Sequence, residues 1–179
     1  MIDRKENQTM MGKTHAAGGA AIGTALGMAM NLPFEQLLLC SMMGCIGGLI
    51  PDIDQQNSMI TKKTGAVGAV ISRIFTHRGI LHTPVFYLLA NFILLVCVNA
   101  CLPKALEMTK ICIIGLFGGE ISHLLLDSMN HAGIMWLFPL YNKHFHVLNV
   151  KADGMIDTVI RTICAIYCVA VFFFCFLHR

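Results

Sequence analysis

The sequence predicts an all-α membrane protein, a polytopic helix bundle that forms one domain over residues 1–179. Of its 179 residues, 56% are hydrophobic and 13% are charged, whereas an ordinary soluble domain has roughly a quarter charged residues. The mean hydropathy is +0.68. In addition, nearly every His and Asp suited to metal binding lies at an end of an apolar segment. These observations favour a membrane bundle with one polar site.

Five apolar segments are candidate membrane helices, at 14–30, 36–50, 84–102, 111–126 and 159–177. Spanning a bilayer takes about 20 residues, so the second and fourth segments are short and either tilt or reach only part of the way across. The first segment is expected to be a retained span, since no small-residue cleavage site follows it.

Two connections are long enough to have structure of their own. In the 51–83 connection, the stretch 65–75 (GAVGAVISRIF) has the apolar pattern of an amphipathic interfacial helix. The region 128–154 mixes aromatic residues with His, Asn and Pro and is expected to form a lid or re-entrant segment. The cysteines lie inside the apolar segments, where Cys usually packs as a small hydrophobe.

The basic residues predict that the amino terminus lies in the cytoplasm. With this orientation the inner segments contain nine Lys and Arg residues and the outer segments contain three, as the positive-inside rule requires. The net charge is +3, and the basic residues do not cluster with aromatic ones, so no nucleic-acid partner is expected.

The fourth apolar segment carries a stripe of ionisable residues. Glu120, His123 and Asp127 have i, i+3 and i+7 spacing, which places them along one side of a helix. A His and a carboxylate one turn apart can share a metal ion. The alternative is a hydrogen-bonded core histidine beside an aspartate that faces water. Ionisable groups inside an apolar bundle are costly and mark functional sites, which favours the metal.

Two more clusters flank the 51–83 connection. In GGLIPDIDQQNS, Asp52 and Asp54 follow a helix-ending proline, and an extended DxD pair points both carboxylates to one side, as suits a divalent ion. The alternative is a pair of solvated loop acids. In THRGILHTP, His77 and Arg78 precede His82, which can bring together a metal ligand, an acid or base and an anion clamp. The alternative is a basic anchor near the lipid headgroups.

Residues at two other segment ends complete the pattern. His15 lies in THAAGGAAIG, whose small residues allow another helix to approach closely. Asp153 and Asp157 precede the last apolar segment, and Asp157 is the deeper of the two. If the segments cross the membrane in alternating directions, all of these clusters arrive at one face.

The clusters together resemble the family of LexA-regulated, membrane-bound metal-dependent hydrolases, the YdjM-like proteins of bacterial inner membranes. The matching stretches are TH at 14–15, GGLIPDIDQQNS at 47–58, HRGILHTP at 77–84 and GGEISHLLLDSMNHAGIMWLFPL at 118–140. Gln55 stands where the family commonly has His, and Asp157 where it more often has Glu. The family is described as distantly similar to zinc-dependent phospholipase C and nuclease P1, which implies phosphoester hydrolysis by analogy.

The sequence therefore predicts a metal-dependent hydrolase of the inner membrane that acts at the cytoplasmic leaflet on a phosphoester or other anionic, lipid-linked substrate. The expected ligands of one or two divalent ions are His15, Asp52, Asp54, His82, His123 and Asp127. Zinc is expected first because imidazole is plentiful, with manganese or magnesium as alternatives. The expected catalytic residues are His77 or Asp157 for proton transfer and Arg78 for holding an anionic group. Participation of Glu120 or Asp153 is left open.

Two other functions fit the same residues. A metal-ion transporter would place ligands near the bilayer midplane, with polar residues on both sides of them. A non-catalytic structural or regulatory membrane protein would use its polar cluster to fasten loops to helices. The second alternative predicts no bound metal and little effect of Asp52→Ala beyond stability.

Overall fold

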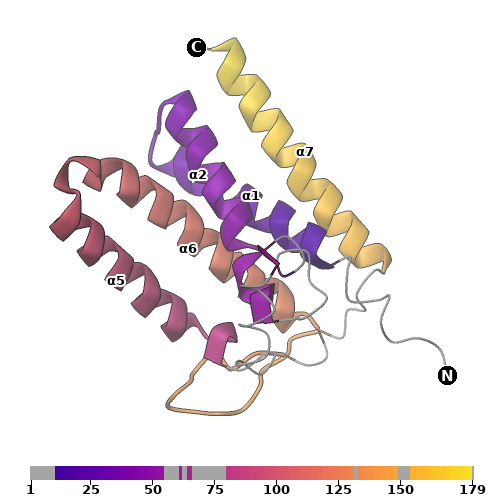
Figure 1. The fold of residues 1–179 in the computed structure, drawn as a ribbon. Helices are drawn as coiled ribbons and strands as arrows, with labels where there is room; N and C mark the ends of the chain where they lie inside the picture. Colours follow the sequence, from indigo (N-terminus) through magenta and orange to yellow (C-terminus); the bar gives the residue numbers. More distant parts are fainter. Residues whose placement is uncertain are drawn as a thin grey trace.

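The computed structural model describes residues 11–54, 61, 64–65, 80–130, 133–148 and 154–178. The regular elements of this part of the chain are helices (Figure 1): α1 (Met11–Ala29), α2 (Phe34–Gly47), η1 (Ile50–Asp54), η2 (Ile80–His82), α5 (Pro84–Cys101), η3 (Pro103–Ala105), α6 (Leu106–Ser128) and α7 (Met155–Leu177). Within the same residues, an isolated bridge between Ile134 and Phe145 is the one β interaction. The predicted all-α fold is confirmed.

Four helical stretches among the described residues are long and apolar enough to cross a membrane: Phe34–Asp54, Pro84–Cys101, Pro103–Ser128 and Met155–Leu177. The first expected span, 14–30, does form α1, but α1 is not one of these four. Its glycines and the polar residues Lys13, Thr14 and His15 explain the difference, because they lower its mean hydropathy. The expected interfacial helix at 65–75 lies, apart from Gly65, outside the described residues.

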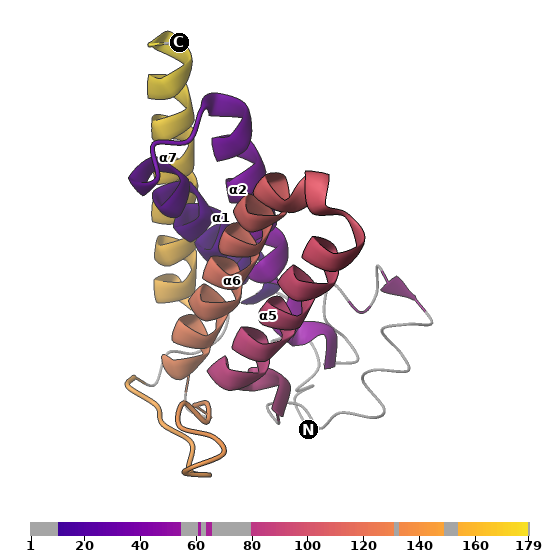
Figure 2. The same cartoon turned by 90° about the vertical axis from the view of Figure 1, so that its left-hand side faces the viewer.

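The helices alternate in direction, so their ends gather at two opposite ends of the bundle. The α1–α2 turn, the α5–α6 turn and the end of α7 lie at one end (Figures 1 and 2). The other end, which we call the polar end, holds η1, η2, the last turn of α6, the first turn of α7 and the segment 133–148. Helices α1, α2 and α6 pack on one another, with α7 along α1 and α5 along α6.

Glycines allow α1, α2 and α6 to meet backbone to backbone. Gly44 of α2 lies between Gly19 of α1 and Gly119 of α6, and a Cβ added to either neighbour would overlap the Gly44 carbonyl. A Cβ on Gly48, just beyond α2, would overlap the backbone oxygen of His15. Small residues at helix contacts permit such close approach in membrane bundles. The helices that lead to the polar end are therefore held close together.

This packing predicts that Gly119→Ala destabilises the protein by about 1 to 3 kcal/mol, because the added methyl group meets backbone atoms of α2 that cannot move alone. Gly118→Ala is the matched control, since a Cβ there would meet only side-chain atoms of Leu26 and Ile22, which can rotate away. Thermal unfolding in detergent, followed by circular dichroism, measures both variants. Equal destabilisation by the two substitutions would contradict the described contact.

Candidate metal centre

The structure places the six expected metal ligands together at the polar end. They come from four separate elements, α1, η1, η2 and α6, and they are His15, Asp52, Asp54, His82, His123 and Asp127. Every one of these side chains is buried. Burying charged groups is costly unless they have close partners, so the contacts within the cluster decide what it can do.

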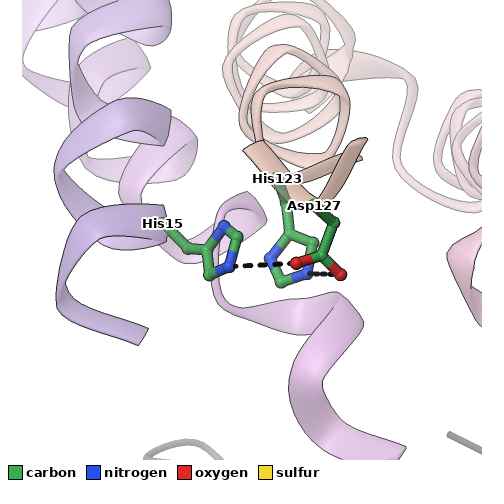
Figure 3. Close-up of side chains that lie close together, drawn as sticks. All are labelled: His15, His123 and Asp127. Atoms are coloured by element: carbon green, nitrogen blue, oxygen red, sulfur yellow. Dashed lines mark ion pairs between the residues drawn. The ribbon is translucent and has the colours of Figure 1, made fainter. Parts of the chain in front are cut away.

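Asp127 lies at the centre of the cluster. Its Oδ1 atom is 3.5 Å from His15 Nε2, and its Oδ2 atom is 3.5 Å from His82 Nε2 and 3.6 Å from His123 Nε2. Figure 3 shows His15 reaching Asp127 from α1, while His123 and Asp127 come from adjacent turns of α6. Asn130 donates a 3.0 Å hydrogen bond to Asp127 Oδ1. One carboxylate thus faces three imidazoles.

His123 is oriented by the backbone at the end of α2. Its Nδ1 atom lies 2.7 Å from the Gly48 carbonyl oxygen. Because a carbonyl only accepts hydrogen bonds, Nδ1 carries a proton, and Nε2 is the ring atom that faces Asp52 and Asp127. The His15 ring stacks on His123 with centroids 3.8 Å apart. Metal-binding histidines commonly donate their second N–H to a carbonyl in this way.

The two aspartates of the DxD pair face different histidines. We expected an extended pair with both carboxylates on one side, and this was wrong, because residues 50–54 form the 3₁₀ helix η1. An Asp52 N to Leu49 O hydrogen bond of 3.2 Å closes the turn. Asp54 Oδ2 lies 3.4 Å from His82 Nδ1, and Asp52 Oδ1 lies 3.8 Å from His123 Nε2.

The start of α5 fixes the position of His82. Thr83 is the N-cap of α5, with its hydroxyl accepting from Phe86 N at 3.4 Å and donating to Ile80 O at 2.8 Å. Pro84 follows in the first turn, where its missing N–H costs nothing. Burial lowers the pKa of His82, against the opposing effect of Asp54 and Asp127. The neutral imidazole, which is the form that binds metals, is therefore favoured.

The separations between these nitrogen and oxygen atoms suit ligands of a shared ion. They range from 3.4 to 3.8 Å, beyond ordinary hydrogen bonds of about 2.7 to 3.2 Å. Two ligands of one tetrahedral zinc ion are about 3.3 to 3.5 Å apart. Two groups could hold an ion, His15 with His123 and Asp127, and Asp52 with His82 and His123. Since His123 Nδ1 is engaged by Gly48, both groups depend on the same Nε2 atom.

The expected catalytic residues are less connected to this cluster. Asp157 is buried in the first turn of α7, but no hydrogen bond or ion pair joins it to the six residues within the described part of the chain, and its Oδ2 atom has no hydrogen-bond partner there. His77, Arg78 and Asp153 lie outside the described residues. Their catalytic roles stay predictions.

Sequence reasoning missed two supporting residues and left a third open. Asn130 and the Gly48 carbonyl orient Asp127 and His123, although the i+3 spacing of Asn130 from Asp127 was a usable signal. Glu120 lies one turn before His123, and its Oε2 atom accepts a 2.6 Å hydrogen bond from Asn91 of α5. No ion pair between Glu120 and the imidazoles is present among residues 11–54, 80–130 and 133–148.

Comparison with known proteins assigns the chain to a family. Residues 10–178 match the model of a family described as YdjM inner membrane protein. The chain belongs to this family. The expected YdjM resemblance and membrane location are thereby confirmed, since the family is one of inner membrane proteins and the fold supplies apolar helices. No solved structure matches the chain, and the expected distant similarity to phospholipase C and nuclease P1 stays a prediction.

Relatives of this YdjM-family protein occur in different bacteria. Protein YvsG of Bacillus subtilis, described as uncharacterized, is 37% identical over 130 residues, which cover 73% of this chain and 74% of YvsG. The inner membrane protein YdjM of Escherichia coli is 34% identical over 93 residues, or 51% of this chain and 44% of that protein, and YdjM of Shigella flexneri gives the same values. The aligned stretch is therefore less than half of either YdjM protein.

The geometry predicts that Asp127→Ala destabilises metal-free protein by about 3 to 5 kcal/mol, because it leaves three buried imidazoles without their common carboxylate. Asp157→Ala removes a carboxylate that is also 3% exposed but has no such partners, so a change of about 1 kcal/mol or less is expected. Denaturant unfolding in detergent with a chelator compares the two. A similar loss of unfolding free energy in the two variants would contradict the central position of Asp127.

Proposed function

We propose that this YdjM-family protein is a membrane-bound metal-dependent hydrolase. The observation that carries the proposal is the position of Asp127, whose two carboxylate oxygens face imidazoles from three different elements. A cluster that only fastened helices together would be expected to use hydrogen bonds of ordinary length. Here the nitrogen–oxygen separations are longer than that and suit a cation between the groups.

The proposed metal ligands are the six clustered residues, with His123 Nε2 and Asp127 as the central pair. A single ion with ligands from both groups is the simplest arrangement, because the two groups share His123. Zinc fits the imidazole share of the site, and the carboxylates leave manganese or magnesium open. When bound, the ion would lower the pKa of water and polarise an oxygen of the substrate.

The proposed substrate is a lipid phosphoester or another anionic, lipid-linked molecule. Support comes from the place of the cluster at the helix ends, where lipid headgroups would lie, while acyl chains would lie beside the membrane-crossing helices. A transporter would instead be expected to hold ions near the middle of its spans. The excess of Lys and Arg on the inner segments supports a site at the cytoplasmic leaflet. Arg78 would bind the anionic group, and His77 or Asp157 would transfer protons.

Metal analysis tests the first half of the proposal. Protein purified without chelators is expected to contain stoichiometric divalent metal, and His123→Ala and Asp127→Ala are expected to lose it because each removes a ligand shared by the cluster. His144→Ala is the control, since His144 is exposed and its ring lies near the Gly133 carbonyl instead. Elemental analysis by mass spectrometry gives the stoichiometry. A parent protein without metal would reject the metal centre.

Measurement of lipid hydrolysis tests the second half of the proposal, the hydrolase activity. Vesicles containing phosphatidate or phosphatidylglycerol should be hydrolysed in a reaction that a chelator stops and that zinc or manganese restores. Asp52→Ala should lower the rate by at least about 100-fold, since even partners that only orient ligands are worth roughly 10- to 100-fold. Release of diacylglycerol is the measured product. A metal-loaded parent that cleaves neither lipid would argue against these phosphoesters as substrates.

A further inference from the structure

A second buried polar cluster lies between α5 and α6. It consists of Tyr87, Asn91 and Glu120, which are 2%, 6% and 3% exposed. Asn91 Nδ2 donates to Glu120 Oε2 at 2.6 Å and to the Tyr87 backbone oxygen at 2.9 Å. Because the Tyr87 backbone oxygen can only accept a hydrogen bond, the orientation of the amide is fixed. Asn91 Oδ1 and the Tyr87 hydroxyl have no hydrogen-bond partner among the described residues.

This cluster adjoins the metal centre on its bilayer side. Glu120 is one turn before His123 on α6, so a rise of 1.5 Å per residue puts it about 4.5 Å deeper than His123 and about 10 Å deeper than Asp127. The other two residues come from the start of α5, which begins two residues after His82, with Tyr87 about one turn and Asn91 about two turns into the helix. The two clusters therefore form one polar region that extends inward from the polar end.

Glu120 is in surroundings that disfavour a negative charge. No Lys, Arg or His forms an ion pair with it in the part of the chain that the structure describes. A buried carboxylate with one amide donor is poorly compensated, and such a group generally takes up a proton instead. A neutral carboxyl group can donate a proton to a neighbouring oxygen.

We propose that Glu120 carries a proton and delivers it to the leaving-group oxygen of the substrate, which Tyr87 and Asn91 position. This inference rests on the proposed phosphoesterase function. In a lipid phosphoester whose phosphate lies at the polar end, the oxygen that joins phosphorus to the diacylglycerol points toward the bilayer. The Tyr87 hydroxyl and Asn91 Oδ1, which have no partner among the described residues, are the groups that would hydrogen-bond to it.

The proposed step balances as an ordinary hydrolysis. An oxygen from water forms a bond to phosphorus, and the bond from phosphorus to the diacylglycerol oxygen breaks. The electron pair stays on that oxygen, which takes the proton of Glu120 and leaves as the alcohol. The proton lost by the attacking water passes to a base at the polar end and afterwards restores the Glu120 carboxyl group.

Infrared spectroscopy tests the protonation of Glu120 without any turnover. The difference spectrum between the parent and Glu120→Gln should contain the carbonyl band of a protonated carboxylic acid, because Gln keeps the shape and can still accept from Asn91. Glu107→Gln is the matched control on the same helix. Its carboxylate is 84% exposed and bonded to Lys110 at 2.7 Å, so no such band should be lost. Absence of the band in the parent would overturn the inference.

The dependence of the hydrolysis rate on the leaving group tests the proton transfer from Glu120. Glu120→Gln should slow phosphatidate hydrolysis by roughly 100-fold or more, the usual range for general acids. The same substitution should change little the rate at which a nitrophenyl phosphate with a long alkyl chain on its ring is hydrolysed, because nitrophenolate leaves without a proton. Glu107→Gln should leave both rates unchanged.

The outcomes separate this inference from the proposed function. Equal slowing of both substrates by Glu120→Gln would assign Glu120 a structural role and overturn the proton transfer. Turnover by a parent that lacks the infrared band would overturn only this inference. A parent that shows the band but cleaves neither probe would refute the phosphoesterase function, and the role of Glu120 as its acid with it.

Discussion

The backbone of Gly48 connects the helix bundle to the polar cluster. Its carbonyl fixes the ring of His123 from α6, and its Cα lies so close to α1 that an added Cβ would overlap the backbone oxygen of His15. One residue at the end of α2 therefore contacts both the ring of His123 and the backbone of His15, and these two rings stack on each other. A shift of the end of α2 would disturb both its packing against α1 and the hydrogen bond that orients His123.

Six ionisable side chains are buried together in a small volume, which is electrostatically unfavourable. Three imidazoles and three carboxylates are buried at one end of a bundle whose other surfaces are largely apolar. In a bilayer such groups are unfavourable unless they compensate each other or bind an ion. Outside the cluster, the polar pairs between helices are hydrogen-bonded, as with Thr24 and Ser41 at 2.9 Å. Six of the eight buried His, Asp and Glu side chains of the described residues therefore lie in this cluster, and Glu120 and Asp157 are the other two.

Periodicity and segment order were enough to predict the fold class and the convergence of polar residues. Segments that alternate in direction must bring His15, Asp52, His82 and Asp127 to one end, and the structure places them there. Whether they bind a metal is a separate matter, which stays a prediction. The span count was harder to predict, because α1 has a helical sequence of low hydropathy and packs among other helices.

The finer contacts of the site could not be predicted from one sequence. The i, i+3, i+7 spacing put Glu120 on the same stripe as His123, but the rotation of α6 relative to α5 decides that Glu120 meets Asn91. In the same way, the 3₁₀ turn of η1 decides that Asp52 and Asp54 face different histidines. Both outcomes depend on packing between segments far apart in the chain, which local patterns do not encode.

X-ray absorption spectroscopy of the bound ion tests most directly that one cation is shared by side chains from separate helices. An ion shared in this way would have a first shell of only nitrogen and oxygen at about 2.0 to 2.2 Å, together with outer-shell scattering from more than one imidazole. A sulfur shell at about 2.3 Å, or the absence of imidazole scattering, would contradict it.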